Sequence, residues 1–251
     1  EGVNIIRGPV QQTMIISLIL KVPASLSADR KSRSTEMVEI PITTSVTLTN
    51  GVLRVDIHTH VDNRARDHRL RVHFPAPLKV NSADYDGHFE IVKRPVGIPP
   101  FDATWAEEPR PETHQRAFTS ISDGGTTLTI ANRGLPEVEV LQSTRAAGSE
   151  IAVTLLRCIS WLSRDDFSTR KSHAGPYLET TSAQMVGEWE FDYSIIPGQV
   201  GDPPCHQAWN FDTPLRAVTT SVHKGALSAS GSFVHVDDPF FVVSAVKVTE
   251  D

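Results

Sequence analysis

The stretch that decides the fold is "HTHVDNRARDHRLRVHFPAP", His58 to Pro77. In its second half the apolar residues Leu70, Val72 and Phe74 alternate with arginine and histidine. A period of two is typical of a β-strand that turns one face to the core. The preceding segment, 51–61, alternates in the same way. The stretch therefore predicts two neighbouring strands joined by a short, charged connection.

The same period continues along the chain. The Asn-Gly pair at 50–51 and the Asp-Gly-Gly run at 123–125 separate alternating segments, and both predict hairpins because such turns need positive φ. Residues 187–196 alternate with Trp, Phe and Tyr on one face. The apolar run at 150–163 is rich in Ile, Val and Thr, which favours a strand over a helix. The tail at 240–248 is apolar on both faces, so we expect a central strand there.

Two proline-rich connections, 75–111 and 197–214, interrupt this pattern. Proline donates no hydrogen bond to a β-ladder, so we expect ordered surface loops in both places. No long segment combines a period of 3.6 with caps at both ends. Many strands joined by turns predict an all-β fold, a large antiparallel sandwich that forms a single domain over residues 1–251.

The composition limits the classes of function. Of the 251 residues, 39% are hydrophobic, which allows a packed core. The net charge of −6 argues against nucleic-acid binding, because that function needs a positive field. The apolar stretch 14–22 is too short to span a bilayer, so we expect no membrane partner and a strand instead. Cys158 and Cys205 are too few for a disulfide framework, and whether they pair is left open.

His58, His60 and Asp62 form a candidate metal site. Alternate residues of a strand project to one side, and two imidazoles with a carboxylate suit zinc. A zinc site needs a third or fourth ligand at a defined spacing, and none is evident in the sequence. The favoured interpretation is a polar strand face that happens to carry these residues.

The arginine run is the second candidate. Arg64, Arg66, Arg69 and Arg71 could form a clamp for an anion or for sugar hydroxyls, because guanidinium offers planar, bidentate donors. The alternative is a network of ion pairs at a strand edge or a domain interface. Asp62 and Asp67 lie within the run and neutralise most of the local field, which favours the network.

A polar loop at 163–184 follows the apolar run and carries Arg164, Asp165, Asp166 and Arg170. Polar loops on a rigid scaffold often carry function, so we expect this one to be structural or to lie beside a substrate. The two aspartates could be a carboxylate pair. Adjacent residues rarely face one cleft, however, which argues against a shared role as acid and nucleophile.

Trp209 is a further candidate, because it falls in the second proline-rich connection and could stack on a sugar. The favoured alternative is that its ring caps the end of the sandwich.

Several segments together resemble one family. "VDNRARDHRLRVHFP" at 61–75 is similar to the Asn-x-x-x-Asp-His-Arg-Leu-Arg strand in the C-terminal half of glycoside hydrolase family 38 α-mannosidases. "IANRGLPEVEVL" at 130–141, followed by "IAVTLLRCISWLSRDD" at 151–166, resembles two further blocks of the bacterial, mannosylglycerate-hydrolase-like branch. "AGPYLETTSAQMVGEWEFDYSIIPG" at 174–198 resembles another. The blocks occur in the expected order over most of residues 40–200.

The resemblance implies a β-supersandwich of the galactose-mutarotase-like type that belongs to a retaining α-mannosidase-type enzyme. In that family, zinc and the aspartate nucleophile lie in an N-terminal α/β domain, which is absent from this chain. The family's catalytic domain carries a His-x-His-x-Asp motif that "HTHVD" at 58–62 imitates. Here that motif runs directly into the sandwich, so zinc ligands are not assigned to it. We therefore expect no cofactor in this chain and zinc in the missing domain.

The resemblance also implies a role and partners. The chain alone is expected to be inactive, to pack on the catalytic domain of the same enzyme, and to complete one wall of its sugar site. The loop from Arg164 to Arg170, with Arg69 and Arg71, would form that wall. Contacts in a homo-oligomer and a bacterial cytoplasmic location complete these expectations.

Two other functions remain open. One is a free-standing module that binds carbohydrate or another partner through the same sandwich. The other is a mutarotase-like epimerase, which would use a His/Glu pair as acid and base, but no such pair can be selected from the sequence.

Overall fold

The computed structural model describes residues 2–144, 147–170, 172–199, 204–238, 241, 243 and 245–249. The chain divides into two units, 1–215 and 216–251. In the second unit the described residues form no helix or strand. The central strand expected at 240–248 lies partly outside the described residues, and the prediction is wrong for those that are described. The strands therefore belong to the unit 1–215.

Strands dominate the first unit, with one short helix and one 3-10 turn in the part that the structure describes. The elements in chain order are β1 (Gly2–Arg7), β2 (Gln11–Pro23), β3 (Met37–Thr49), β4 (Val55–Asn63), β5 (Arg69–Ala76), β6 (Ser82–Asp86), β7 (Ile91–Pro95), β8 (Thr113–His114), β9 (Phe118–Ser122), β10 (Thr126–Asn132), β11 (Glu137–Gln142), β12 (Ser149–Arg157), η1 (Thr181–Gln184), β13 (Gly187–Gln199) and α1 (Pro204–Asp212).

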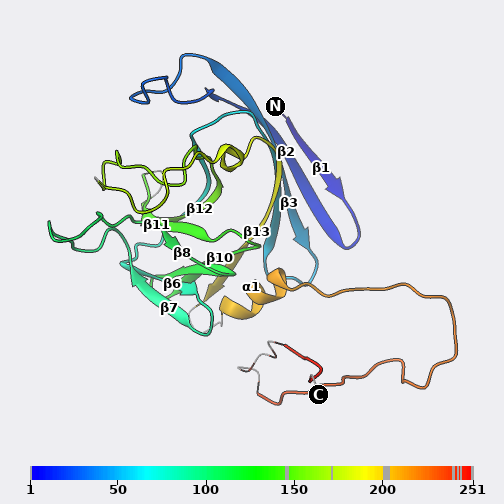
Figure 1. Ribbon diagram of the computed structural model, residues 1–251. Helices are drawn as coiled ribbons and strands as arrows, with labels where there is room; N and C mark the ends of the chain where they lie inside the picture. Colours follow the sequence, from blue (N-terminus) through cyan, green and yellow to red (C-terminus); the bar gives the residue numbers. More distant parts are fainter. Residues whose placement is uncertain are drawn as a thin grey trace. The chain divides into compact units, whose positions relative to one another are not determined.

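The strands form two antiparallel sheets (Figure 1). The large sheet has the order β1-β2-β3-β4-β13-β10-β9-β6-β7, and the small sheet has the order β5-β12-β11-β8. The expected all-β antiparallel sandwich is confirmed. β4 and β5 are consecutive in the chain but belong to different sheets, so the charged connection between them crosses from one layer to the other.

The turn signals in the sequence are confirmed. Gly51, with φ of 77°, lies between β3 and β4, and Gly124, with φ of 94°, lies between β9 and β10. Both need the left-handed region that glycine adopts without steric cost. The apolar run at 150–163 supplies β12, which is a buried central strand of the small sheet and not a helix.

The main core lies between the two sheets. It joins Ile57 and Val61 of β4 to Ile151 and Val153 of β12, and Cys158 belongs to it. A second, smaller cluster packs α1 against β9, β10 and β13. Cys205 belongs to this second cluster, and both cysteines are buried and free, so they do not pair. No helix among the described residues is long and apolar enough to cross a membrane.

Candidate functional site

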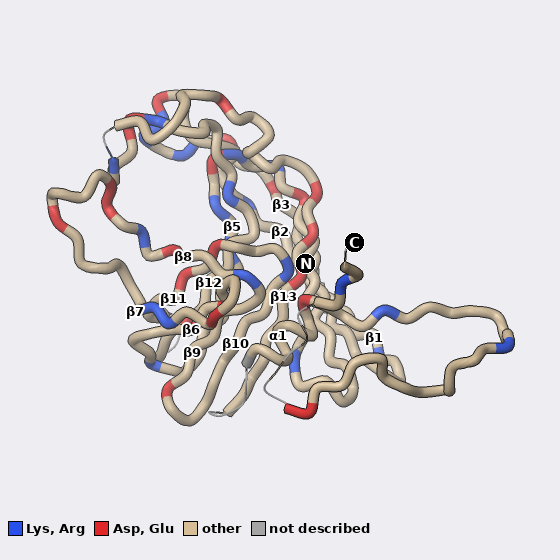
Figure 2. The backbone as a smooth tube through the Cα atoms, turned by 60° about the horizontal axis from the view of Figure 1, so that its bottom comes forward, with Lys and Arg blue, Asp and Glu red and all other residues tan. Residues whose placement is uncertain are grey.

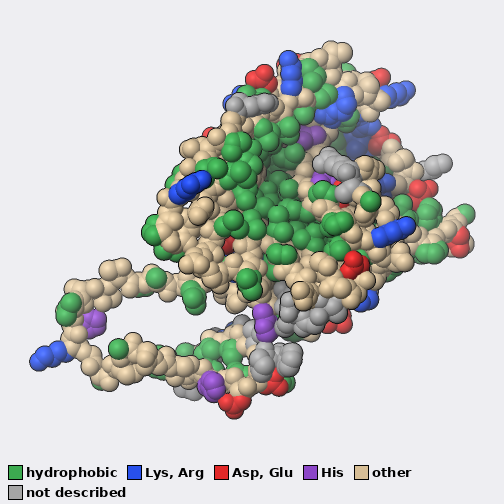
Figure 3. Space-filling model, turned by 180° about the vertical axis from the view of Figure 1, so that it is seen from behind, with side chains coloured by type: hydrophobic (Ala, Val, Ile, Leu, Met, Phe, Trp, Pro, Cys, Tyr) green, Lys and Arg blue, Asp and Glu red, His purple; other side chains and the backbone are tan. Residues whose placement is uncertain are grey.

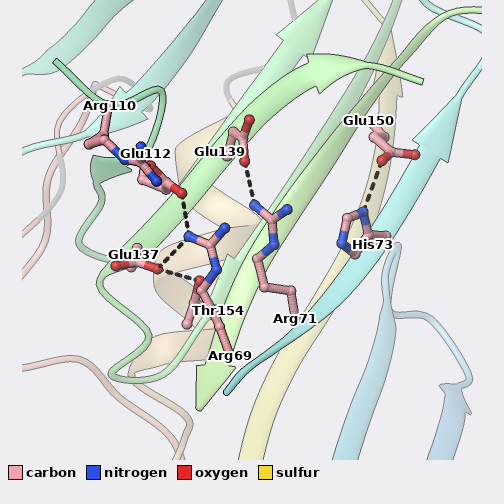
Figure 4. Close-up of polar contacts among 9 residues, drawn as sticks. All are labelled: Arg69, Arg71, His73, Arg110, Glu112, Glu137, Glu139, Glu150 and Thr154. Carbon is pink, nitrogen blue, oxygen red and sulfur yellow. Dashed lines mark hydrogen bonds and ion pairs between the residues drawn. The ribbon is translucent and has the colours of Figure 1, made fainter. Parts of the chain in front are cut away.

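Charged side chains project from the outward face of the small sheet (Figure 4). Arg69, Arg71 and His73 lie on β5 and alternate with residues that pack into the main core. The outward placement of the three side chains was expected from the alternation. We call these residues, with their partners, the β5 ladder.

Arg69 is held by two glutamates from outside its strand. It pairs with Glu112 and, at 3.5 Å, with Glu137 of β11. Burial of the Glu112 carboxyl acts to raise its pKa, but the hydrogen bond from Arg69, a backbone hydrogen bond and the charges of Arg69 and Arg110 together hold the pKa below its usual value. Burial also opposes the charge of Arg69, yet the bond to Glu112 raises the pKa of the guanidinium. Both groups are therefore ionised, and they form an ion pair with each other.

Arg71 and His73 find their partners across the sheet. Arg71 pairs with Glu139 of β11, so its side chain must cross the intervening β12. Arg71 lies opposite Thr154 and Glu139 lies opposite Ala152, so the side chain of Arg71 spans two interstrand spacings, about 9.6 Å, and also runs two residues along the strand. His73 Nδ1 lies 2.9 Å from Glu150 Oε1. This histidine and glutamate contact each other directly, whereas an epimerase pair must face a substrate between them.

The β5 ladder is thus satisfied from within the sandwich. Basic and acidic residues are interspersed along the backbone (Figure 2). The interpretation as an ion-pair network is confirmed, although its partners were misjudged. Asp62 does pair with Arg64 at 2.5 Å, but the β5 arginines use glutamates from strands and loops distant in the sequence.

His58, His60 and Asp62 share the outward face of β4 but do not converge. His58 and Asp62 are four residues apart on an extended strand, which separates their Cα atoms by about 13 Å, whereas zinc needs ligands at about 2 Å. His58 Nδ1 lies 2.9 Å from Asp192 Oδ1, and Asp62 accepts hydrogen bonds from Arg64. Within the described residues, no group of three or more His, Cys, Asp or Glu side chains could hold a metal ion. These three residues do not fit zinc.

The connection between β4 and β5 is held by a polar network centred on Asp67. Ser160 Oγ and Gln184 Nε2 both donate to Asp67 Oδ1, at 2.6 and 2.7 Å. The Asp67 N–H donates to Gln184 Oε1 at 2.8 Å. Burial acts to raise the pKa of Asp67, but the two side-chain donors, the Leu26 N–H and the charge of Arg33 together lower it. Asp67 has φ of 53°, which aspartate tolerates better than most residues.

Asn63 and His68 extend the network into the core. Asn63 is fully buried, and its Nδ2 donates to the Met185 carbonyl at 2.8 Å. The same side chain bonds to His68 Nε2 through Oδ1, at 2.9 Å. Burial lowers the pKa of His68, and the nearby charge of Arg33 adds to the effect. The Asn-x-x-x-Asp-His motif therefore has a structural task, which is to tie the start of β5 to the segment 158–185.

The loop at 163–184 packs against other loops through its charged residues. Arg164 Nε donates to Asp166 Oδ1 at 2.9 Å, and Asp166 also pairs with Arg30 from the connection between β2 and β3. Asp165 points elsewhere, and its carboxylate lies 3.6 Å from His173. The two aspartates thus have different partners, as the argument from adjacency predicted.

Arg170 makes a second link between loops. Its Nη1 lies 2.8 Å from Glu107 Oε2, in the connection between β7 and β8. The same connection ends at Glu112, the partner of Arg69. The loops 24–36, 96–112 and 158–185 therefore meet at one end of the sandwich, which we call the loop end. Arg170 also donates to the Arg164 carbonyl at 3.3 Å, whereas Arg69 is linked to this end through Glu112.

Trp209 lies elsewhere. It belongs to α1, which follows the far end of β13, so the expected surface loop at 197–214 is wrong for its second half. Its ring is half-buried and meets Phe118 edge-on at 6.5 Å. Arg133 fastens the same helix by donating from Nε to the Phe211 carbonyl at 3.0 Å. Phe118, Ala131 and Ile196, which α1 covers, alternate with core residues, so the helix packs on the outer face of the large sheet. Trp209 is thus a packing residue, as the alternative held, but it covers a sheet face and not the end of the sandwich.

The sequence did not single out Asn63, Ser160 and Gln184 as a connected group. They are 97 and 24 residues apart in the chain, and only the pairing of β13 with β4 and of β12 with β5 makes them neighbours. The one available signal was that all three fall within blocks that resemble the same family.

Comparison with known proteins identifies the family. The model of the glycosyl hydrolases family 38 C-terminal domain matches residues 3–168. This chain belongs to glycosyl hydrolase family 38, as its C-terminal domain. The resemblance inferred from the sequence blocks is confirmed.

Individual relatives agree with this assignment. A "Putative mannosylglycerate hydrolase" from Halalkalibacterium halodurans is 31% identical over 228 residues, which are 89% of this chain and 23% of that protein. A family 38 glycosyl hydrolase from Enterococcus faecalis has a TM-score of 0.75 at 28% identity, over 90% of this chain and 26% of its own. An α-mannosidase from Enterococcus faecalis V583 has a TM-score of 0.74 at 30% identity, over 90% and 25%. This chain spans about a quarter of the length of these relatives.

Proposed function

We propose that this chain is the C-terminal sandwich of a retaining α-mannosidase-type glycoside hydrolase, which packs on a catalytic domain and completes one wall of its sugar site. The observation that carries the proposal is the family match over residues 3–168. Support comes from the relatives, which are named as a mannosylglycerate hydrolase and an α-mannosidase and are about four times as long.

The chemistry is assigned to the other domain. Retaining hydrolysis needs two carboxyl groups about 5–5.5 Å apart across the glycosidic bond. Asp165 and Asp166, the pair considered from the sequence, turn to different partners and do not offer this arrangement. His58, His60 and Asp62 do not fit zinc, so we assign the metal of the family to the catalytic domain as well.

The loop end is the part of the sandwich that we assign to the sugar site. Ion pairs join its three loops, so their shape is set before any ligand arrives and little conformational entropy is lost on binding. Arg164 and Arg170 are mostly covered by their own partners, whereas Asp165 is 56% exposed. Asp165 is therefore the residue best placed to accept a hydrogen bond from a sugar hydroxyl.

Two experiments test the proposal. The complete reading frame is expected to encode a catalytic domain ahead of the sandwich, and a frame that encodes only the sandwich would overturn it. In the full-length enzyme, Asp165→Asn is expected to raise KM several-fold with kcat nearly unchanged, since the contact is the same in the ground and transition states. An unchanged KM would remove the loop end from the sugar site.

A free-standing carbohydrate-binding module is the second candidate. Trp105 and Tyr177 are 51% and 50% exposed, and both lie in loops of the loop end. Exposed aromatic rings can stack on sugars. Binding of a manno-oligosaccharide to this chain alone, lost in Trp105→Ala or Tyr177→Ala, would favour this candidate.

We also propose the bacterial cytoplasm as the compartment and a homo-oligomer as the assembly. The free, buried Cys158 and Cys205 support a reducing compartment, where unpaired thiols persist. Mass measurement of the full-length enzyme in solution tests the assembly, and a monomer would contradict it.

A further inference from the structure

One face of the strands at the edge of the large sheet is apolar. Residue pairing places Val3 and Ile5 of β1 on the same side as Ile16 and Met14 of β2. The side chains Leu18 and Leu20 continue the row on β2. On β3, Ile42 and Ile40 pair with Leu18 and Leu20 and lie on the same side. We call this surface the β1–β3 apolar face, and its less covered part is formed by Val3, Ile5, Met14, Ile16, Leu18 and Leu20.

The face continues the main core outward but loses its cover. Val61 on β4 is fully buried, and its neighbour Ile42 on β3 is 8% exposed. On the next strands exposure rises to 36% for Met14 and 65% for Val3. Figure 3 shows hydrophobic side chains gathered in a hollowed area on one side of the molecule. The small sheet thus covers the β4 side of the large sheet and leaves the β1 side open.

The opposite side of the same strands is more polar. On β2 it carries Thr13, Ser17 and Lys21 alongside Ile15 and Ile19, so it is mixed where the apolar face is uniformly hydrophobic. A β-strand with one solvated face alternates apolar and polar residues. The apolar row on β2 therefore indicates that this face is covered by protein. A contiguous exposed apolar area of this kind marks an interaction surface.

A hollow of about 410 Å³ joins this face to the family motif. Leu20, Val22 and Ile40 line it from β2 and β3, and Asp67, His68 and Arg69 line it from the start of β5. The β5 ladder offers no comparable docking surface, because its arginines are already paired with glutamates of the sandwich.

We propose that the β1–β3 apolar face is the surface on which the catalytic portion of the same polypeptide packs, with an apolar side chain of that portion seated in the hollow beside Leu20. The inference rests on the proposed function and names its docking surface. The packing partner is inferred from the relatives, because about three quarters of their length lies outside the part that this chain matches. Permanent interfaces are more hydrophobic than transient ones, so an apolar face suits a domain that stays attached.

The test compares two neighbouring positions in the full-length enzyme. Ile5 and Ile6 are 55% and 54% exposed in the sandwich, and they lie on opposite faces of β1. Ile5→Cys and Ile6→Cys are made separately, and the rate of alkylation by iodoacetamide is measured for each. Cys158 and Cys205 of the sandwich are buried, and alkylation is followed on the peptide that carries position 5 or 6, so that other cysteines of the enzyme do not contribute. We expect the cysteine at position 5 to react at least about tenfold more slowly than the one at position 6, through protection by packing.

The other outcomes are distinct. Equal alkylation rates in an enzyme that still hydrolyses an aryl α-mannoside would overturn the docking surface and leave the proposed function standing. Protection at position 5 that disappears on dilution would assign the face to a second copy of the chain and overturn the inference. A reading frame without a catalytic portion would overturn both the inference and the proposed function.

Discussion

Replacing Asp67 by asparagine is expected to lower the free energy of unfolding by about 1.5 kcal/mol. The substitution keeps the shape of the side chain, and asparagine tolerates the φ of 53° at this position. What changes is the charge that receives the hydrogen bonds from Ser160 and Gln184 at Oδ1, together with the weak acceptor for the Leu26 N–H at Oδ2. A hydrogen bond to a charged group is worth about 1 kcal/mol more than a neutral one, so two bonds give about 2 kcal/mol. Partial exposure of Asp67 to solvent reduces this to about 1.5 kcal/mol.

Urea unfolding at pH 7 measures the difference, with Asp165→Asn as the matched control. Asp165 undergoes the same chemical change on an exposed side chain, and we expect an effect within about 0.5 kcal/mol. An Asp67→Asn value no larger than that of the control would refute the network as a stabilising element.

The dependence on pH gives a second check of the same reasoning. The pKa of Asp67 is lower in the folded protein than its ordinary value of 3.8. Stability that depends on the ionised carboxylate is therefore fully present above about pH 3.8 and is lost as pH falls through the folded-state pKa. The difference between wild type and Asp67→Asn should shrink below pH 4, and a constant difference would show that charge is not its cause.

Three further substitutions test other parts of the account. Arg71→Met should lower the free energy of unfolding in urea by about 2–3 kcal/mol, because it leaves the mostly buried Glu139 without its cation. Adding Glu139→Gln should restore part of the loss. A loss below about 0.5 kcal/mol, as expected for a surface pair, would contradict the β5 ladder as a stabilising element. Gly148→Ala should prevent or severely impair folding, because its Cβ would lie 2.1 Å from the Ala76 carbonyl oxygen; a normal melting temperature would contradict this backbone approach. Arg133→Leu should free α1 and speed proteolysis after residue 199, and an unchanged cleavage rate would show that packing alone holds the helix.

Local patterns in the sequence predicted local structure well. The alternation of Leu70, Val72 and Phe74 placed β5 and its outward arginines correctly, because the side-chain period of a strand depends only on the chain itself. The glycine turns were predicted for the same reason. At the tail, the apolar composition of 240–248 predicted a strand that its described residues do not form. A strand needs a neighbouring strand, and composition does not show whether one is available.

Contacts between distant segments could not be predicted in this way. The sequence suggested Asp62 and Asp67 as partners of the arginine run, since they are adjacent to it. Arg71 instead pairs with Glu139, which the order of strands in the small sheet brings near. Trp209 was expected in a loop because of the prolines before it, yet proline is also accepted in the first turn of a helix.

The most direct test of the central claim is hydrolysis of an aryl α-mannoside, measured with added zinc for this chain alone and for the full-length enzyme. We predict turnover by the full-length enzyme and none by residues 1–251. Zinc-dependent turnover by this chain alone would contradict the assignment of catalysis to another domain.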